Sequence, residues 1–531
     1  MTTIVNNNDN NNNSKKTENQ NIKTKIVQEP EDDFLDIITS IYKYHVSYPS
    51  LNIPMKINFN SSGRKLQPTL PRDKRCIFQF ATRTKTDFKR IHSHTLVGSS
   101  FYLHSGLCDK SKLAILIEDY FSKIPQNNVN NHIESSTIDN TKLKTTTNVN
   151  TSSNNKGEII DKTTKKIEYP NKLNNRHIFI PSPSIMIDKT FIINSTIDQI
   201  KQFFNNKMIN KQKQQQQPWC MKASNVNNSL GVKFYKDLNT LIDDLKRFVN
   251  EIDDTTYLIQ PYVNNVLTYQ RKKCHVRLNV LIVGGNVNVF IHRDCIVHVA
   301  AKEIVNNSTK QDYNDRDVHV TNHLAKPGQD IDKEKKVITL MDLEKDTKIP
   351  NLSNDLFQQM CTIIQDVFKI LHGRGDLFLP IENSFELFGA DFLIQRNDND
   401  ESLKCILLEI NSGPGLEGRV DRELCTSIMN DTLQIVFDPW YSNLLNVIKG
   451  GGCSSMKKTD WMNIDAMPSI IPERYCYLGS SSSGGNGEDE GVTTSNTSSS
   501  SSSSLASSRF LLSDQFMEYL YKLYQFVLEN D

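Results

Sequence analysis

FELFGADFLIQ (residues 385–395) and KCILLEIN (residues 404–411) are two apolar stretches joined by the polar segment RNDNDES. Their length, their composition and the turn residues between them predict two strands paired as a hairpin. Alternate residues of a strand face the same side, so Glu409 and Asn411 share one face, about 7 Å apart, while Leu408 faces the core. The hairpin therefore presents two oxygen-bearing side chains together at a strand end.

Asp391 places a carboxylate inside the first of these apolar strands. The predicted pairing brings Asp391 next to the strand that carries Glu409 and Asn411. Carboxylate and amide oxygens are the ligands that a hard cation such as Mg²⁺ prefers. The alternative for a single aspartate is a strand edge that meets water or an arginine, but the three residues together favour a metal site.

Positively charged residues lie in or at the ends of other predicted strands. Lys222 ends the stretch WCMK, Lys273 and Arg277 lie in KCHVRLNVLI, and Arg293 follows the next apolar stretch. Lysine offers a point charge and arginine a bidentate fork to phosphates and carboxylates. Each residue alone is most simply a solvated strand end, but together with the oxygen ligands they predict a Mg²⁺-nucleotide site. The sequence has neither a P-loop nor a G-x-G-x-x-G fingerprint, so the nucleotide needs another fold.

Composition limits the partners and the compartment. The chain has 531 residues with 62 basic and 61 acidic side chains, a net charge of +1. This balance disfavours a nucleic-acid or membrane-surface binder, and no apolar run reaches the roughly 18–20 residues that cross a bilayer. The ten cysteines form no C-x-x-C pair, which favours reduced thiols in a cytoplasmic protein.

Low-complexity tracts divide the chain into six predicted parts. They are a disordered tail (1–33), an N-terminal domain (34–122), a low-complexity insert (123–175), a main folded region (176–448), a Gly/Ser-rich linker (449–509) and a C-terminal amphipathic helix (510–531). Within the main region, apolar periodicity predicts a helix over 353–372, capped by Ser353 or Asn354. The charged stretch 325–350 is predicted to be a surface loop.

The motifs, taken in order, resemble those of the tubulin–tyrosine ligase family, which belongs to the ATP-grasp carboxylate–amine ligases. The matching strings are GLCDKSKLAILI (106–117), IFIPSPSIMI (178–187), WCMKASN (219–225), YLIQPYV (257–263), KCHVRLNVLI (273–282), VFIHRD (289–294), HVTNH (319–323), FELFGADFLI (385–394) and LLEINSGPGL (407–416). The resemblance covers about half of the chain. It implies an α/β (α+β) ATP-grasp fold for residues 176–448, with a smaller N-terminal domain.

The resemblance also implies a role for each candidate site residue. The implied nucleotide-binding residues are Lys222, Gln260, Tyr262, Val263, Lys273 and Thr321; the implied catalytic residues near the γ-phosphate and the acceptor are Lys110, Arg277, Arg293 and Asn322; and Asp391, Glu409 and Asn411 would hold Mg²⁺.

The implied reaction is an ATP-dependent ligation in two steps. A carboxylate of the acidic C-terminal tail of tubulin becomes an acyl phosphate, and the amine of a free amino acid then displaces the phosphate. Cations are needed because two anions must meet, and no covalent enzyme nucleophile is required. The resemblance implies tubulin and a free amino acid as partners and an association with the cytoskeleton in the cytoplasm. Because every proposed site residue comes from one chain, we expect a monomer, and the composition predicts no nucleic-acid or membrane partner.

Three functional alternatives follow. LCDKSKL and HVTNH favour tyrosine as the amino acid, and polyglutamylation or glycylation is the alternative, although no long basic stretch follows residue 440. Two departures from the family pattern motivate a catalytically inactive, tubulin-binding pseudo-ligase. Pro261 replaces a hinge lysine, and His275 replaces the aspartate of Lys-x-Asp-x-Arg.

Overall fold

The computed structural model describes residues 43–48, 52–61, 64, 66–70, 72–92, 96–123, 179–207, 217–224, 226, 231–251, 254–285, 287–304, 312–321, 337–397, 402–416, 422–439, 441–442 and 471–480. The predicted tail (1–33) and the predicted C-terminal helix (510–531) lie outside these residues. So does the predicted insert (123–175), apart from its first residue.

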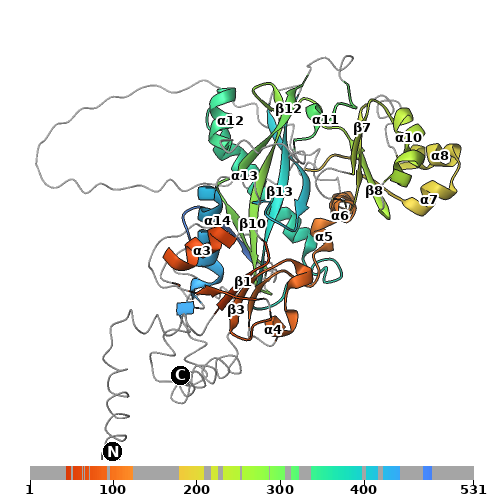
Figure 1. Cartoon of the computed structure of the whole chain (residues 1–531). Helices are drawn as coiled ribbons and strands as arrows, with labels where there is room; N and C mark the ends of the chain where they lie inside the picture. The colour runs from red at the N-terminus through yellow and green to blue at the C-terminus, as the bar shows by residue number, and fades with distance from the viewer. Residues whose placement is uncertain are drawn as a thin grey trace, which may run out of the picture.

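A large sheet forms the centre of the molecule (Figure 1). Its strands are β1 (Lys43–Val46), β2 (Gln67–Pro68), β3 (Cys76–Phe80), β4 (Val97–Ser99), β9 (Thr268–Tyr269), β10 (Lys272–Val283), β11 (Asn288–His292), β12 (Ile296–Glu303), β13 (Ser384–Arg396), β14 (Leu403–Asn411) and β15 (Tyr475–Ser480). The main path runs β15-β11-β10-β13-β4-β3-β1-β2, with β9 and β12 paired to β10 and β14 paired to β13. Strands from residues 43–99 therefore extend the same sheet rather than forming one of their own.

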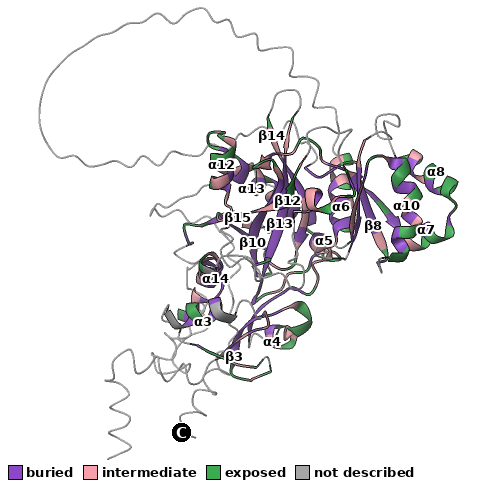
Figure 2. Ribbon diagram, turned by 45° about the horizontal axis from the view of Figure 1, so that its top comes forward, coloured by how far each residue is buried: buried purple, intermediate pink, exposed green. Residues whose placement is uncertain are grey.

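The predicted hairpin is present as β13 and β14, which run antiparallel with Asp391 opposite Glu409. β10 pairs along the other side of β13, with Arg277 opposite Asp391. Both long strands are buried along most of their length (Figure 2). The three strands that carry the predicted metal and phosphate residues thus lie side by side.

Helices cover both faces of the large sheet. On one face, α13 (Leu352–Leu371), α12 (Leu340–Thr347) and α6 (Lys110–Ser122) enclose a core with the even-numbered residues of β10. On the other face, α3 (Asn52–Ser61) and α14 (Arg422–Val436) pack beside Leu281 and Val283. Alternate residues of a strand share one face, so the face of β10 that carries Leu281 and Val283 also carries Lys273, His275 and Arg277. These three residues lie beyond the end of this second core.

A second, four-stranded antiparallel sheet has the order β5 (Ile185–Asp188), β8 (Thr256–Pro261), β6 (Trp219–Ala223), β7 (Val232–Tyr235). The helices α7 (Lys189–Asn194), α8 (Ile197–Lys207) and α10 (Leu238–Glu251) cover its outer face, where Trp219 and Met221 are buried (Figure 1). α6 contacts β5, β8 and β14, so it lies between the two sheets.

Two segments differ from the sequence prediction. α12 lies inside the predicted loop 325–350, because Thr339 and Asp342 form a capping box that starts a helix. β15 lies inside the predicted linker 449–509; it pairs with β11 and buries Tyr475, Cys476 and Leu478. α13 is confirmed as a helix.

The mixed α/β class is also confirmed. Within the described ranges, no helix combines the length and apolar character needed to cross a bilayer.

Candidate active site

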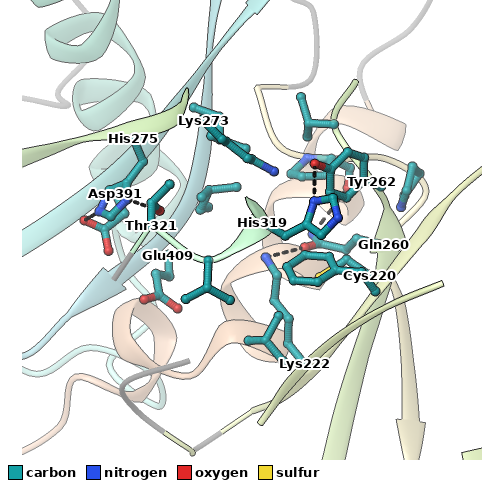
Figure 3. Close-up of a pocket in the computed structure, with 18 residues that line it drawn as sticks. Cys220, Lys222, Gln260, Tyr262, Lys273, His275, His319, Thr321, Asp391 and Glu409 are labelled. Carbon is teal, nitrogen blue, oxygen red and sulfur yellow. Dashed lines mark hydrogen bonds and ion pairs between the residues drawn. The ribbon is translucent and has the colours of Figure 1, made fainter. Parts of the chain in front are cut away.

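A cleft of about 740 Å³ lies between the two sheets (Figure 3). Its lining residues come from β6, β7 and β8 of the small sheet, from β10, β13 and β14 of the large sheet, and from the segment 312–321. The site is thus built by the strands that the sequence singled out, together with one further segment.

On the small-sheet side, Lys222 and Gln260 face into the cleft (Figure 3). Lys222 Nζ donates to Gln260 Oε1 at 3.0 Å, and Gln260 Nε2 donates to Ser184 Oγ at 2.8 Å. Lys222 and Cys220 face the cleft because their neighbours Trp219 and Met221 occupy the core of the small sheet. This chain of hydrogen bonds holds a buried ammonium group in place for an anionic ligand.

Aromatic rings form the next part of the wall. Lys273 Nζ lies 4.1 Å from the ring centroid of Tyr262, a cation–π contact that fixes the lysine side chain. Tyr262 Oη lies 2.9 Å from His319 Nδ1, and His319 Nε2 lies 3.0 Å from the backbone oxygen of Asp312. Burial, and then the charge of Lys273, lower the pKa of His319 to about 4. His319 is therefore neutral at pH 7.

On the large-sheet side, Arg277 and Asp391 form a buried ion pair. Arg277 Nη2 donates to Asp391 Oδ2 at 2.8 Å, and Arg277 Nε donates to Asp391 Oδ1. Burial raises the pKa of the Asp391 carboxyl, but Arg277 and His275 outweigh burial and hold it well below its usual value. Asp391 is thus an anion in a buried position.

Glu409 and Asn411 reach the same position from β14. Asn411 Nδ2 donates to Asp391 Oδ2 at 3.1 Å and to Glu409 Oε1 at 3.2 Å. The strand register shifts between Asp391 and Phe392, so Leu408 forms a bulge. The prediction that Leu408 faces the core is wrong, since it lines the cleft beside Glu409.

Lys110 completes the polar cluster from a different part of the chain. It starts α6, which Asp109 caps, and it is only 6% exposed. Its Nζ lies 3.4 Å from Glu409 Oε2 and donates to the backbone oxygen of Val226 at 3.0 Å. Lys110 therefore links the helix between the sheets to the carboxylate of β14.

The structure brings most of the predicted site residues together. The cleft and its polar floor contain Lys110, Lys222, Gln260, Tyr262, Val263, Lys273, Arg277, Thr321, Asp391, Glu409 and Asn411. Asn322 lies outside the described residues.

Arg293 is not among the residues that line the cleft. The preceding odd-numbered residues of β11, Val289 and Ile291, belong to the core under α13, and Arg293 continues on that face. Its guanidinium lies 5.0 Å from the ring centroid of Phe357.

Sequence reasoning missed some lining residues. Phe234 and Cys220 line the cleft, and His298 lies opposite His275 with the two rings stacked. The alternation within WCMK could have identified Cys220, since it shares a strand face with Lys222. His298 had no such signal, because its position depends on the pairing of β10 with β12.

The donor set fits a hard divalent cation. Asp391, Glu409 and Asn411 offer oxygen atoms, and rotation of the Asn411 amide would turn its oxygen towards the carboxylates. Among the described side chains, no group of three or more His, Cys, Asp and Glu could hold a metal ion. Mg²⁺ uses one or two carboxylates and takes its other ligands from phosphates and water, and Asp391 and Glu409 offer two carboxylates.

Gly389 and Gly415 make room for the Arg277 side chain, which yields a first prediction. Gly415 has φ +69°, and a Cβ there would overlap Arg277 Nη1. We expect Gly415→Ala to destabilise the fold by about 2 kcal/mol, from left-handed strain plus displacement of Arg277. Gly413→Ala is the matched control, since nothing lies within 4 Å of its Cβ. Equal urea midpoints for the two variants would contradict this account.

His319 yields a prediction about acid stability. Its pKa is about 4 in the folded chain, below the ordinary histidine value of 6.5, so the unfolded chain binds more protons between these pH values. Stability should therefore fall as the pH drops from 6.5 towards 4. We expect His319→Gln to reduce the loss of unfolding free energy between pH 7 and pH 5 by about 1–2 kcal/mol. Urea titrations at both pH values test this, and an unchanged loss would contradict it.

Comparisons with known proteins agree on a family. The model of the tubulin-tyrosine ligase family matches residues 123–443, more than half of the chain. Tubulin glycylase 3B of Drosophila melanogaster is 22% identical over 242 residues, which cover 41% of this chain and 29% of that protein. A probable tubulin–tyrosine ligase of Schizosaccharomyces pombe is 30% identical over 162 residues, 30% of this chain and 36% of that protein.

Two further matches complete the comparison. A probable tubulin polyglutamylase of Homo sapiens is 24% identical over 262 residues, 47% of this chain and 40% of that protein. The chain thus spans less than half the length of these three curated relatives. Among solved structures, the chain is similar to the C-terminal domain of K. lactis Pby1, which is described as an ATP-grasp enzyme interacting with the mRNA decapping enzyme Dcp2. The alignment has a TM-score of 0.48 and 18% identity, and it covers 76% of this chain and 94% of that chain.

Proposed function

Because the chain belongs to the tubulin-tyrosine ligase family, we propose that it is an ATP-dependent ligase that joins an amino acid to the acidic C-terminal tail of tubulin. One observation carries this proposal. Buried cations from both sheets and the oxygen donors Asp391, Glu409 and Asn411 converge on one cleft.

The two walls of the cleft suit the two ends of a nucleotide. Gln260, Tyr262 and Val263 provide a partly apolar wall for a base, with hydrogen-bonding groups at its edge. Lys222 and Lys273 stand between that wall and the oxygen donors, where phosphates would be neutralised. Thr321 would order the 312–321 segment through its contact with His275.

Asp391, Glu409 and Asn411 would hold Mg²⁺, which when bound supplies charge neutralisation for the phosphates. Arg277 keeps Asp391 ionised. Lys110 fixes the position of the Glu409 carboxylate through its ion pair. These fixed charges need no rearrangement when negative charge develops on the transferring phosphoryl group.

The proposed reaction has two steps. An acceptor carboxylate attacks the γ-phosphorus of ATP, and ADP leaves as an acyl phosphate forms. The amine of the amino acid then attacks the acyl carbon, phosphate leaves, and the amine loses a proton as the amide bond forms. Arg277 and Lys110 form ion pairs with these oxygen donors, so they would orient the acceptor carboxylate beside them.

Tyrosine is the amino acid that the sequence motifs favour, and glycine or glutamate is the alternative named by the relatives. The test mixes the purified chain with ATP, Mg²⁺, tubulin and one labelled amino acid at a time. Label from tyrosine alone in the tubulin tail supports tyrosine ligation, and label from glycine or glutamate alone moves the assignment to that amino acid.

A tubulin-binding pseudo-ligase is the second candidate, motivated by Pro261 and His275. It predicts that ATP or tubulin binds while no amino acid is incorporated under any of these conditions. Sedimentation of the unlabelled chain with and without microtubules would test the proposed cytoskeletal association. Sedimentation of the chain without microtubules would test the proposed monomeric state. The cytoplasmic location remains a separate proposal.

A further inference from the structure

Glu118 lies on α6, the helix between the two sheets, and its carboxylate holds the segment that leads into β5. The side chain is half-buried, and its Oε1 accepts a hydrogen bond from the backbone nitrogen of Ser184 at 2.6 Å. Burial raises the pKa of Glu118, while hydrogen bonds from Ser182 and Ser184 partly oppose that rise. Glu118 is not among the residues that line the cleft, but it fixes the position of Ser184.

Ser184 connects Glu118 to the cleft through its hydroxyl group. Ser184 Oγ donates to the backbone oxygen of Pro181 at 2.9 Å. Gln260 Nε2 donates to Ser184 Oγ at 2.8 Å and to the same Pro181 oxygen at 3.3 Å. The opposite orientation of the amide would set its oxygen against a carbonyl oxygen and its nitrogen against the ammonium group of Lys222. The neighbours of Gln260 therefore decide which way its amide points.

Lys222 ends this chain of hydrogen bonds. Pairing of β6 with β8 places Lys222 opposite Leu258 and fixes its backbone, but the ammonium group sits at the end of a flexible four-carbon stem. Its Nζ donates to Gln260 Oε1 at 3.0 Å, and Lys222 is 8% exposed. The position of this buried charge thus depends on the orientation of the Gln260 amide.

The helix that carries Glu118 also reaches the other wall of the cleft. Lys110 begins α6, and its Nζ lies 3.4 Å from Glu409 Oε2. Lys110 and Glu118 are eight residues apart, about 12 Å along the helix axis. One rigid element therefore holds a cation beside the oxygen donors and a carboxylate behind the small-sheet wall.

We propose that Glu118 is a positioning residue of the nucleotide site, which holds the Lys222 ammonium group where the phosphates of a nucleotide bind. It acts through Ser184 and Gln260 and does not touch the nucleotide. The inference rests on the proposed function and adds to it a residue outside the cleft. A role in the fold alone would let substitution of Glu118 lower stability while nucleotide affinity stays the same.

The test measures nucleotide binding without turnover. Titration calorimetry gives the Kd of Mg²⁺-ADP for the full chain, and urea unfolding gives the stability of each variant. We expect Glu118→Leu to weaken binding about tenfold, in line with the displacement of one hydrogen bond to a charged group. Glu118→Gln keeps an oxygen for the Ser184 N–H, so it should bind within about threefold of the wild type. Asp119→Asn is the matched control, since Asp119 is an exposed carboxylate of the same helix that pairs with Lys123, and it should bind like the wild type.

Substitution of Ser184 tests the route from Glu118 to Lys222. Ser184→Ala removes the hydroxyl that holds Gln260 but keeps the backbone N–H that Glu118 binds. We expect Ser184→Ala alone to weaken binding about fivefold, which keeps the test open if Glu118→Leu does not fold. Adding Glu118→Leu to Ser184→Ala should weaken binding by less than about twofold further, because the route is already broken.

Three results would count against these assignments, and they are distinguishable. Wild-type affinity for Mg²⁺-ADP in Glu118→Leu or in Ser184→Ala overturns the inference and leaves the proposed function standing. Losses of affinity that multiply in the double variant overturn the route through Ser184, and with it the inference. Failure of the wild type to bind Mg²⁺-ADP removes the proposed function as well.

Discussion

Glu409→Gln should lower amino-acid transfer at least about 100-fold while the chain stays folded. The substitution removes one negative charge from the oxygen donors and leaves Lys110, whose Nζ lies 3.4 Å from Glu409 Oε2, without its partner carboxylate. Loss of a group that binds or positions the cation costs about 10–100-fold or more. Glu409 is 22% exposed but Lys110 is only 6% exposed, so loss of the pair should cost about 1–3 kcal/mol of stability.

The measurement is initial-rate incorporation of the labelled amino acid at saturating ATP, with urea unfolding as the check on the fold. Glu303→Gln is the matched control, since Glu303 is an exposed glutamate that pairs with Arg271 at the end of β12. It should transfer at the wild-type rate. Transfer by Glu409→Gln within a few-fold of wild type would rule out the assigned cation site.

The fold could be predicted from the sequence where the local pattern of apolar residues agrees with the observed strand pairing. The predicted mixed α/β class is confirmed, and the central hairpin, β13 and β14, follows from two apolar stretches and a polar turn. α13 follows from its apolar stripe. β15 was hidden, because six residues in a Gly/Ser-rich context become a strand only through pairing with β11.

The site was predictable residue by residue only where the strand alternation is regular. Lys222, Lys273, Arg277 and Asp391 lie on the expected faces. The bulge at Leu408 breaks the alternation, and a bulge is set by the partner strand rather than by the sequence of one strand.

Arg293 shows the same limit from another side. It resembled a site arginine by its motif, but it follows β11 on the face that α13 covers, where its exposed side chain lies against Phe357. Lys110 belongs to the site because it contacts Glu409, which lies 299 residues further along the chain (409 − 110). A contact between such distant residues leaves no local pattern in the sequence.

Arg277→Met should produce the largest loss of stability of any single change in the site, about 3–5 kcal/mol. Arg277 is 6% exposed and Asp391 is 2% exposed, and the arginine also donates from Nη1 to the backbone oxygen of Pro414 at 3.2 Å. Methionine fills part of the space between the two glycines, but it leaves the Asp391 carboxylate buried without its main counter-charge. The penalty comes from that stranded charge rather than from lost packing.

A double substitution separates these two sources. In Arg277→Met with Asp391→Asn, no buried carboxylate remains, so we expect the double variant to be more stable than the Arg277→Met single variant by about 1–3 kcal/mol. Urea unfolding of the wild type, both single variants and the double variant gives the coupling energy. Additive losses of unfolding free energy would mean that Arg277 stabilises the fold through packing against Gly389 and Gly415. The ion pair with Asp391 would then contribute nothing to stability.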